Sequence, residues 1–182
     1  MADKEFYTMK IAGLERNLPI CPLNEDINIA GFIMFSDVEI TVKAAEELLK
    51  KAPDFDIILT SEAKGIPLAY EMSRQSGKTY IVARKGIKLY MKEPFGVEVK
   101  SITTAGVQHL YLSKADKDLM KGKKILIADD VISTGESLNA LVKLVDAVGG
   151  ILVGQFTVLA EGDAAKRDDI TFLEELPILP NK

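Results

Sequence analysis

Short apolar runs alternate with segments of helical character along the middle and end of the chain. The run at 123–130 has the length and aliphatic content of a buried strand, and 136–150 places its apolar residues on one helical face before two glycines end it. The pattern predicts strands at 56–61, 79–85, 97–103, 123–130 and 151–160, and helices at 39–52, 66–76 and 136–150.

Strands that alternate with helices favour parallel βαβ units. The predicted fold class is therefore α/β, with a central, mostly parallel sheet flanked by helices. In such a sheet a ligand lies beyond the carboxyl ends of the strands. Three segments follow predicted strands and carry groups that bind anions or hydroxyls: 60–65, 83–88 and 128–135.

The N-terminal region has a different pattern. Two prolines and the Asn24-Glu25-Asp26 turn interrupt it, so we expect a few short strands there. We predict a small hood over residues 1–38 and an α/β core over 39–182, within one compact domain. The core begins with the helix at 39–52, for which Thr41 is the expected N-cap.

The composition is that of a globular protein without an obvious polyanionic partner. With 182 residues, 47% of them hydrophobic, the chain can bury a substantial core, and a net charge of −4 argues against a general binder of nucleic acid or anionic membranes. The only cysteine, Cys21, cannot form an internal disulfide and is expected to be a small buried residue. The N-terminus does not resemble a signal peptide, and no apolar run is long enough to cross a bilayer, so we expect a cytoplasmic protein.

The stretch ILIADDVISTGES, residues 125–137, carries the most specific signal. An apolar strand ends in two adjacent aspartates, Asp129 and Asp130, and a hydroxyl-rich turn then opens a helix. The turn offers consecutive backbone N–H groups and a helix N-terminus, which can bind a phosphate without any lysine. Each residue alone would suit an acidic strand end before a capped helix. The combination predicts a ligand that carries both a diol and a phosphate.

This stretch resembles the phosphoribosyl pyrophosphate (PRPP) signature of the type I phosphoribosyltransferase family. The resemblance implies that the two aspartates hold the ribose 2′ and 3′ hydroxyls and that the loop binds the 5′-phosphate. The residues assigned in this way are Asp129, Asp130, Val131, Ser133, Thr134, Gly135, Glu136 and Ser137. Small or neutral residues are common at the position of Glu136, so its carboxylate must point away from the phosphate, although it suits the first turn of a helix.

The stretch TSEAKGIPLAY, residues 60–70, resembles the pyrophosphate loop of the same family. The loop residues are Ser61, Glu62, Ala63, Lys64 and Gly65. Members of the family often have a strained peptide bond in this loop, and a non-proline cis peptide bond is therefore our hypothesis here. Without the neighbouring motif, the same residues could equally form an ordinary turn between a strand and a helix.

Basic residues follow the next predicted strand. In the family, residues at this place reach the pyrophosphate, in some members from the neighbouring subunit of a dimer, and here they are Arg84, Lys85 and Lys88. For Lys88, a solvated basic turn is nearly as good an interpretation. A cation beside the leaving group stabilises its departure, so the resemblance gives catalytic roles to Asp129, Asp130 and Arg84.

Residues 89–108 fit the family's mobile loop, which closes over the substrate and excludes water. Its candidate ligand contacts are Ser101, Thr103 and Thr104. The Glu-Tyr-rich pattern usual in adenine-specific enzymes is replaced by SITTAGVQHLY, which is closer to xanthine and archaeal hypoxanthine/guanine enzymes. The single histidine, His109, has no Cys or His partner that would indicate a metal site.

The resemblance implies a purine phosphoribosyltransferase of purine salvage, which transfers the 5-phosphoribosyl group from PRPP to a purine base and releases pyrophosphate. Adenine is favoured, because residues 14–23 also resemble the hood of the adenine enzymes. The alternatives are a hypoxanthine/guanine or xanthine phosphoribosyltransferase, or a non-catalytic PRPP-sensing purine regulator. Mg²⁺ is expected to arrive with PRPP, with no direct protein ligand. We expect PRPP and a purine base as partners, no nucleic acid or membrane, and a homodimer.

Overall fold

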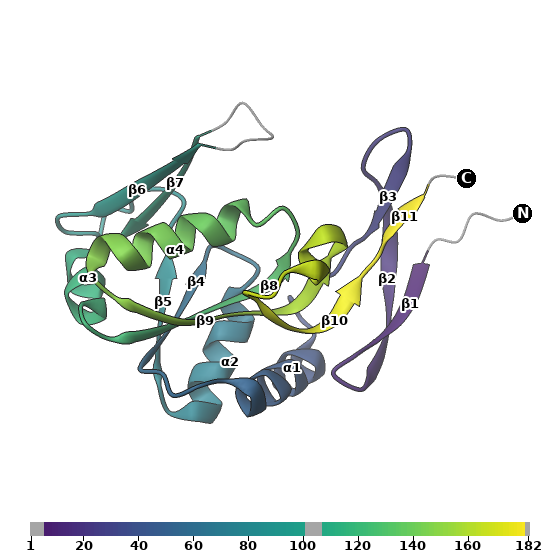
Figure 1. Ribbon diagram of the computed structural model, residues 1–182, viewed down its shortest axis with the longest axis horizontal. Coiled ribbons are helices and arrows are strands. Elements are labelled where there is room, and N and C mark those ends of the chain that lie inside the picture. Colours follow the sequence, from purple (N-terminus) through teal and green to yellow (C-terminus); the bar gives the residue numbers. More distant parts are fainter. Residues whose placement is uncertain (1–5, 101–106, 181–182) are drawn as a thin grey trace, which may run out of the picture.

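The computed structural model describes residues 6–100 and 107–180. Its core is a five-stranded sheet with helices on both faces (Figure 1). The strands are β4 (Ile57–Ser61), β5 (Thr79–Ala83), β8 (Lys124–Ile132), β9 (Ile151–Glu161) and β10 (Thr171–Leu176), and the helices are α1 (Val38–Lys51), α2 (Ile66–Ser76), α3 (Lys114–Met120), α4 (Glu136–Val148) and the 3₁₀ turn η1 (Gly162–Lys166). The sheet order is β10-β9-β8-β4-β5 and every pair is parallel, which confirms the predicted α/β fold class.

Burial on both faces explains the composition of the central strands. All five residues of β4 are buried, and β8 is buried and apolar from Ile125 to Ala128. Helices α1 and α2 cover one face of the sheet, and α4 covers the other (Figure 1). Within the described residues, no helix combines the length and the apolar character needed to cross a membrane.

A separate antiparallel hairpin lies beside α4. It consists of β6 (Phe95–Lys100) and β7 (Val107–Leu112). The strand predicted at 97–103 is found as β6 as far as residue 100, since 101–103 lie outside the described residues, and it does not belong to the core sheet. The backbones of Arg84 and Tyr111 exchange hydrogen bonds of 2.9 and 2.8 Å, which fix the segment after β5 to this hairpin.

A four-stranded antiparallel sheet lies at one side of the core (Figure 1), and we call it the hood sheet. Its strands, in order across the sheet, are β1 (Phe6–Ile11), β2 (Leu14–Pro22), β3 (Ile27–Ala30) and β11 (Ile178–Pro180). The first three agree with the predicted short strands. The fourth was not predicted and comes from the other end of the chain. The proposed division of the chain at residue 38 remains a prediction.

The start of α1 joins the hood sheet to the core. The N-cap is Asp37, whose carboxylate accepts a hydrogen bond of 3.1 Å from the backbone of Ile40; the expected cap, Thr41, is wrong. Arg16 on β2 donates to both carboxylate oxygens of Asp37, at 2.6 and 3.1 Å, and also pairs with Glu39. Hydrogen bonds from Arg16 lower the pKa of Asp37, because they stabilise its charged form.

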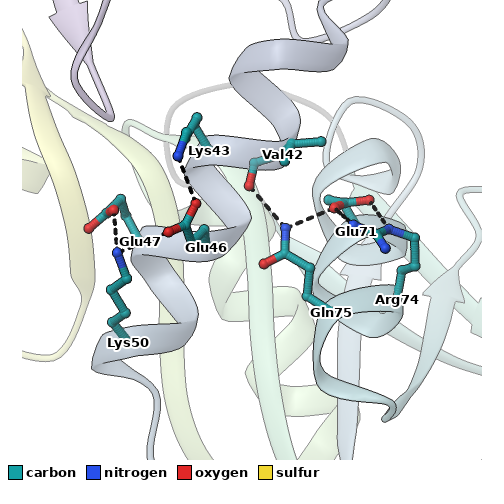
Figure 2. Close-up of polar contacts among 8 residues, drawn as sticks. All are labelled: Val42, Lys43, Glu46, Glu47, Lys50, Glu71, Arg74 and Gln75. Carbon is teal, nitrogen blue, oxygen red and sulfur yellow. Dashed lines mark hydrogen bonds and ion pairs between the residues drawn. The ribbon is translucent and has the colours of Figure 1, made fainter.

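Polar contacts also link α1 to α2 (Figure 2). The amide of Gln75 donates to the backbone carbonyl of Val42 at 3.0 Å and to the Glu71 carboxylate at 2.8 Å, and Arg74 forms a two-point ion pair with Glu71. On the exposed face of α1, Glu46 pairs with two lysines.

Cys21, on β2, is exposed, so the expectation that it is buried was wrong.

We predict that Asp37→Ala lowers the free energy of unfolding by about 1–2 kcal/mol, as expected for loss of a helix cap. Because the pKa of Asp37 is lowered in the folded protein, its contribution is present above the pKa of the unfolded carboxyl and is lost as the pH falls below about 4. Chemical unfolding at pH 7 and pH 3.5 measures both effects. The control Asp118→Ala removes an exposed carboxylate from α3, and an equal loss in both variants would contradict the assignment.

Candidate functional site

The loops after three neighbouring strands surround one cavity. Since β5, β4 and β8 are adjacent and parallel, their carboxyl ends meet at the same edge of the sheet. The cavity has a volume of about 360 Å³ and is lined by residues 61–64, Lys85 and residues 129–138. The structure therefore brings the predicted ribose, phosphate and pyrophosphate residues of 61–64 and 129–137 to one place.

The acidic pair, Asp129 and Asp130, lies near the carboxyl end of β8, which continues to Ile132. The backbone of Asp130 donates a hydrogen bond of 2.9 Å to the Asp129 carboxylate. The Asp130 side chain is almost fully buried, and its Oδ2 has no hydrogen-bond partner, although Lys64 Nζ lies 3.1 Å away. Burial, together with the neighbouring Asp130 carboxylate, raises the pKa of Asp129 to about 7. The Asp130 Oδ2 atom thus lacks a hydrogen bond and has the Lys64 ammonium as its neighbour.

The turn after β8 ends at an uncapped helix N-terminus. Gly135 precedes α4 with a φ of 79°, and no side chain caps the first turn. The first backbone N–H groups of a helix have no partner within the helix, and its dipole favours an anion there. Ser133 and Thr134 are exposed beside this end. The turn thus has the backbone and hydroxyl donors that a phosphate requires.

A basic side chain that the sequence analysis missed lies against this turn. A Cβ atom added to Gly135 would collide with Arg167 Nη1, so the guanidinium packs directly on the glycine. Arg167 is held by Asp169 through hydrogen bonds of 2.8 and 2.7 Å. The two segments are 32 positions apart in the sequence, and nothing local in either one indicates the contact.

The loop after β4 is folded tightly onto the acidic pair. The peptide bond between Glu62 and Ala63 is cis, which confirms that hypothesis. A Cβ atom at Gly65 would collide with Thr60 Oγ1 and lie 2.7 Å from Asp129 Oδ1. Only glycine allows the loop to approach the carboxylate this closely.

The basic residues after β5 converge on Glu62. Arg84 Nη1 and Lys88 Nζ lie 3.0 and 3.4 Å from Glu62 Oε1, and the backbone N–H of Lys85 donates to Oε2 at 3.0 Å. Burial opposes ionisation of Glu62, but the Lys85 N–H and the two cations outweigh it and lower the pKa below its ordinary value. Lys85 lines the cavity, whereas Arg84 and Lys88 are connected to it through Glu62.

Glu161, at the end of β9, is a further acidic residue near the cavity. Burial raises its pKa, and the Lys64 ammonium acts in the opposite direction. The next residue, Gly162, packs against Ile178 of the hood sheet. Glu161 therefore lies where the core meets the hood sheet, and the sequence analysis did not identify it.

The predicted contacts of the mobile loop, Ser101, Thr103 and Thr104, lie outside the described residues. Much of the segment around them is the β6–β7 hairpin. His109 on β7 stacks on Tyr111, and its Nδ1 lies 3.5 Å from Glu98. These contacts give His109 a place in the hairpin rather than in the cavity.

The donor set suits a magnesium ion that arrives with a phosphorylated ligand. Among residues 6–100 and 107–180, no group of three or more His, Cys, Asp or Glu side chains could hold a metal ion. Mg²⁺ is usually bound through one or two carboxylates, waters and substrate phosphates. The carboxylates of Asp129 and Asp130 are of this kind, although Asp130 Oδ2 already lies 3.1 Å from Lys64 Nζ.

We predict that Asp129→Asn stabilises the protein at pH 8 but much less at pH 5. Because the pKa of Asp129 is raised in the folded state, its contribution to stability is greatest below about pH 4 and is lost as the pH rises through about 7. The amide removes this cost and keeps an oxygen for the Asp130 N–H. Thermal unfolding at both pH values tests this, with the exposed Asp146→Asn as control. A shift of the midpoint that is the same at pH 5 and pH 8 would contradict it.

Comparison with known proteins gives consistent results. The chain is 32% identical over 120 residues to the adenine phosphoribosyltransferase of Cenarchaeum symbiosum and 38% identical over 108 residues to the hypoxanthine/guanine phosphoribosyltransferase of Methanosarcina mazei. These matches cover 61% and 59% of this chain but only 64% and 53% of the relatives' lengths. The adenine phosphoribosyltransferase structure from Thermoanaerobacter pseudethanolicus shares the fold, with a TM-score of 0.72 and 23% identity, over 87% of this chain and 95% of that one.

The model of the family described as "Phosphoribosyl transferase domain" matches residues 37–178. That range contains the core sheet, the acidic pair, the turn before α4 and the loop with the cis peptide bond. Because the match covers most of the sequence, the chain belongs to the phosphoribosyl transferase domain family.

Proposed function

We propose that the protein transfers a 5-phosphoribosyl group from PRPP to a purine base and releases pyrophosphate. The observation that carries this proposal is the arrangement around the cavity: the carboxylates of Asp129 and Asp130, an uncapped helix N-terminus, and two lysines, Lys64 and Lys85, all line the same space. PRPP has a diol, a 5′-phosphate and a diphosphate, which need these three kinds of partner. Both relatives named above are purine phosphoribosyltransferases, which supports the class of acceptor.

Each group of residues then has a separate task. Asp129 and Asp130 accept hydrogen bonds from the ribose hydroxyls and fix the sugar. The N–H groups and hydroxyls of 133–137 bind the 5′-phosphate at the start of α4, with the Glu136 carboxylate turned away from it. The 61–65 loop holds the diphosphate. These contacts orient ribose C1 towards the incoming base and cost little reorganisation in the transition state.

Departure of pyrophosphate is the step in which charge must be stabilised. As the bond at C1 lengthens, the sugar becomes an oxocarbenium ion and negative charge grows on the diphosphate. Arg84, Lys85 and Lys88 lie within reach of the loop that would hold it, and their fixed positive charge favours that separation. Mg²⁺ bound to the diphosphate would neutralise part of the same charge.

For the base, we place adenine first and hypoxanthine, guanine or xanthine next. The hood sheet beside the end of β9 supports adenine, since a hood at this place is the feature that the sequence shares with adenine enzymes. We further propose a homodimer in the cytoplasm. Exposed apolar side chains at Ile87, Leu89 and Tyr90, next to the basic segment, support an interface there.

An activity assay with different purine bases tests which base the protein uses. The protein is incubated with PRPP and Mg²⁺ and with adenine, hypoxanthine, guanine or xanthine, and pyrophosphate release is followed. We expect release with adenine and a markedly lower rate with the other bases. Binding of PRPP without release for any base would favour a PRPP-sensing regulator over an enzyme.

We predict that Asp129→Asn combined with Asp130→Asn reduces kcat/KM for PRPP by roughly 100-fold or more, because two hydrogen bonds to charged groups are lost. The protein should still fold, since both amides fit the same space. Steady-state kinetics with varied PRPP measures the effect. The matched control is Asp118→Asn combined with Asp146→Asn on exposed positions of α3 and α4. Near-normal activity of the first variant would contradict the ribose assignment.

A further inference from the structure

The carboxylate of Glu62 takes up the cationic groups that a diphosphate would need. Arg84 and Lys88 both reach its Oε1, at 3.0 and 3.4 Å, and the Lys85 N–H reaches its Oε2 at 3.0 Å. The backbone N–H of Glu62 also donates to Ala83 O at 3.0 Å, which ties the residue to the end of β5. The three donors to the carboxylate all come from the segment after β5, and the acceptor of the Glu62 N–H is the last residue of β5.

Carboxylate and phosphate oxygens compete for the same donors. Both are anionic acceptors, and Arg, Lys and backbone N–H groups form charge-assisted hydrogen bonds with either of them. A diphosphate in this loop must therefore draw Arg84 and Lys88 away from Glu62, or share them with it at a cost in charge repulsion. The Glu62 side chain is 19% exposed, so a carboxylate displaced by the diphosphate can turn into solvent.

A third cation, Lys64 of the 61–65 loop, also lies against a carboxylate. Lys64 Nζ lies 3.1 Å from Asp130 Oδ2, and no other ion pair of Lys64 is present among the described residues. Arg84, Lys88 and Lys64 thus each face a carboxylate of the protein, whereas the exposed Lys85 lines the cavity and forms no ion pair with the described residues.

We propose, on the basis of the function proposed above, that Glu62 is an exchangeable internal anion that takes the place of pyrophosphate when the site is empty. It is a positioning residue: it keeps Arg84, Lys88 and the Lys85 N–H oriented between turnovers. By competing for them, it also weakens the binding of pyrophosphate and allows the product to leave. Its carboxylate does not touch the reacting atoms.

The test is the affinity of magnesium pyrophosphate for Glu62→Gln, measured by titration calorimetry with the ligand-free protein. The amide keeps the size and the hydrogen-bonding oxygen of the side chain but removes the competing charge. We expect the Kd for pyrophosphate to fall about tenfold, because one negative charge a few ångströms from the ligand is removed. Binding that is unchanged or weaker would overturn the proposal, because Glu62 would then support the anion site rather than compete for it.

Two further variants separate charge from shape and from folding. Glu46→Gln on the exposed face of α1 removes a carboxylate that also accepts from two lysines, at 3.0 and 3.2 Å, and should leave the Kd unchanged (Figure 2). Glu62→Asp keeps the charge on a shorter side chain, so the Kd should fall by no more than about threefold. Thermal unfolding checks that each variant is folded. A tenfold fall in either of these two variants would overturn the proposal.

Turnover of the wild-type protein separates this inference from the proposed function. If PRPP is consumed with a purine but Glu62→Gln binds pyrophosphate no more tightly, the inference fails and the function stands. If no base is turned over but Glu62→Gln binds pyrophosphate more tightly, the internal anion stands and the function fails.

Discussion

The loop after β4 can lie against the carboxylates of β8 only because residue 65 has no side chain. Any Cβ there would collide with Thr60 and approach the Asp129 carboxylate. This contact places Lys64 beside Asp130 and turns Glu62 towards the segment after β5. The relative positions of the acidic pair, the loop and the basic residues all depend on that one close approach. A shift of the loop by the width of a methyl group would move Lys64 and Glu62 away from the acidic pair of β8.

The site is also electrostatically costly for the free protein. Burial of the strand end, together with repulsion from the adjacent Asp130 carboxylate, raises the pKa of Asp129. Nearby cations offset this cost: Lys64 lies at Asp130, and Arg84 and Lys88 lie at Glu62. The Coulomb interactions that would bind a polyanionic ligand thus balance the protein's own charges in its absence. In the proposed exchange, this balance lowers the affinity for pyrophosphate while it keeps the cations in place.

Local patterns predicted the elements around the site, whereas contacts distant in sequence were missed. The apolar run and the polar turn at 125–137 are enough to predict both β8 and the start of α4. Strand β4 and helix α2 are likewise predicted from their own residues. Strand β11 has only three residues, and only its pairing with β3 defines it. Both Asp37 and Thr41 have side chains that can cap a helix, so residue type could not choose between them; the ion pair with Arg16 favours Asp37. Arg167 was missed because Gly135, which it contacts, is remote in the sequence.

The hood sheet combines strands from opposite ends of the chain. Its first three strands lie within residues 6–30, but β3 completes its pairing only with β11 at 178–180. On the ribosome, the first three strands therefore remain without this partner until every strand of the core sheet has been synthesised. The core sheet can assemble as its strands appear, and β10 is followed after one residue by β11. The hood sheet is thus completed after the core sheet, once β11 has left the exit tunnel.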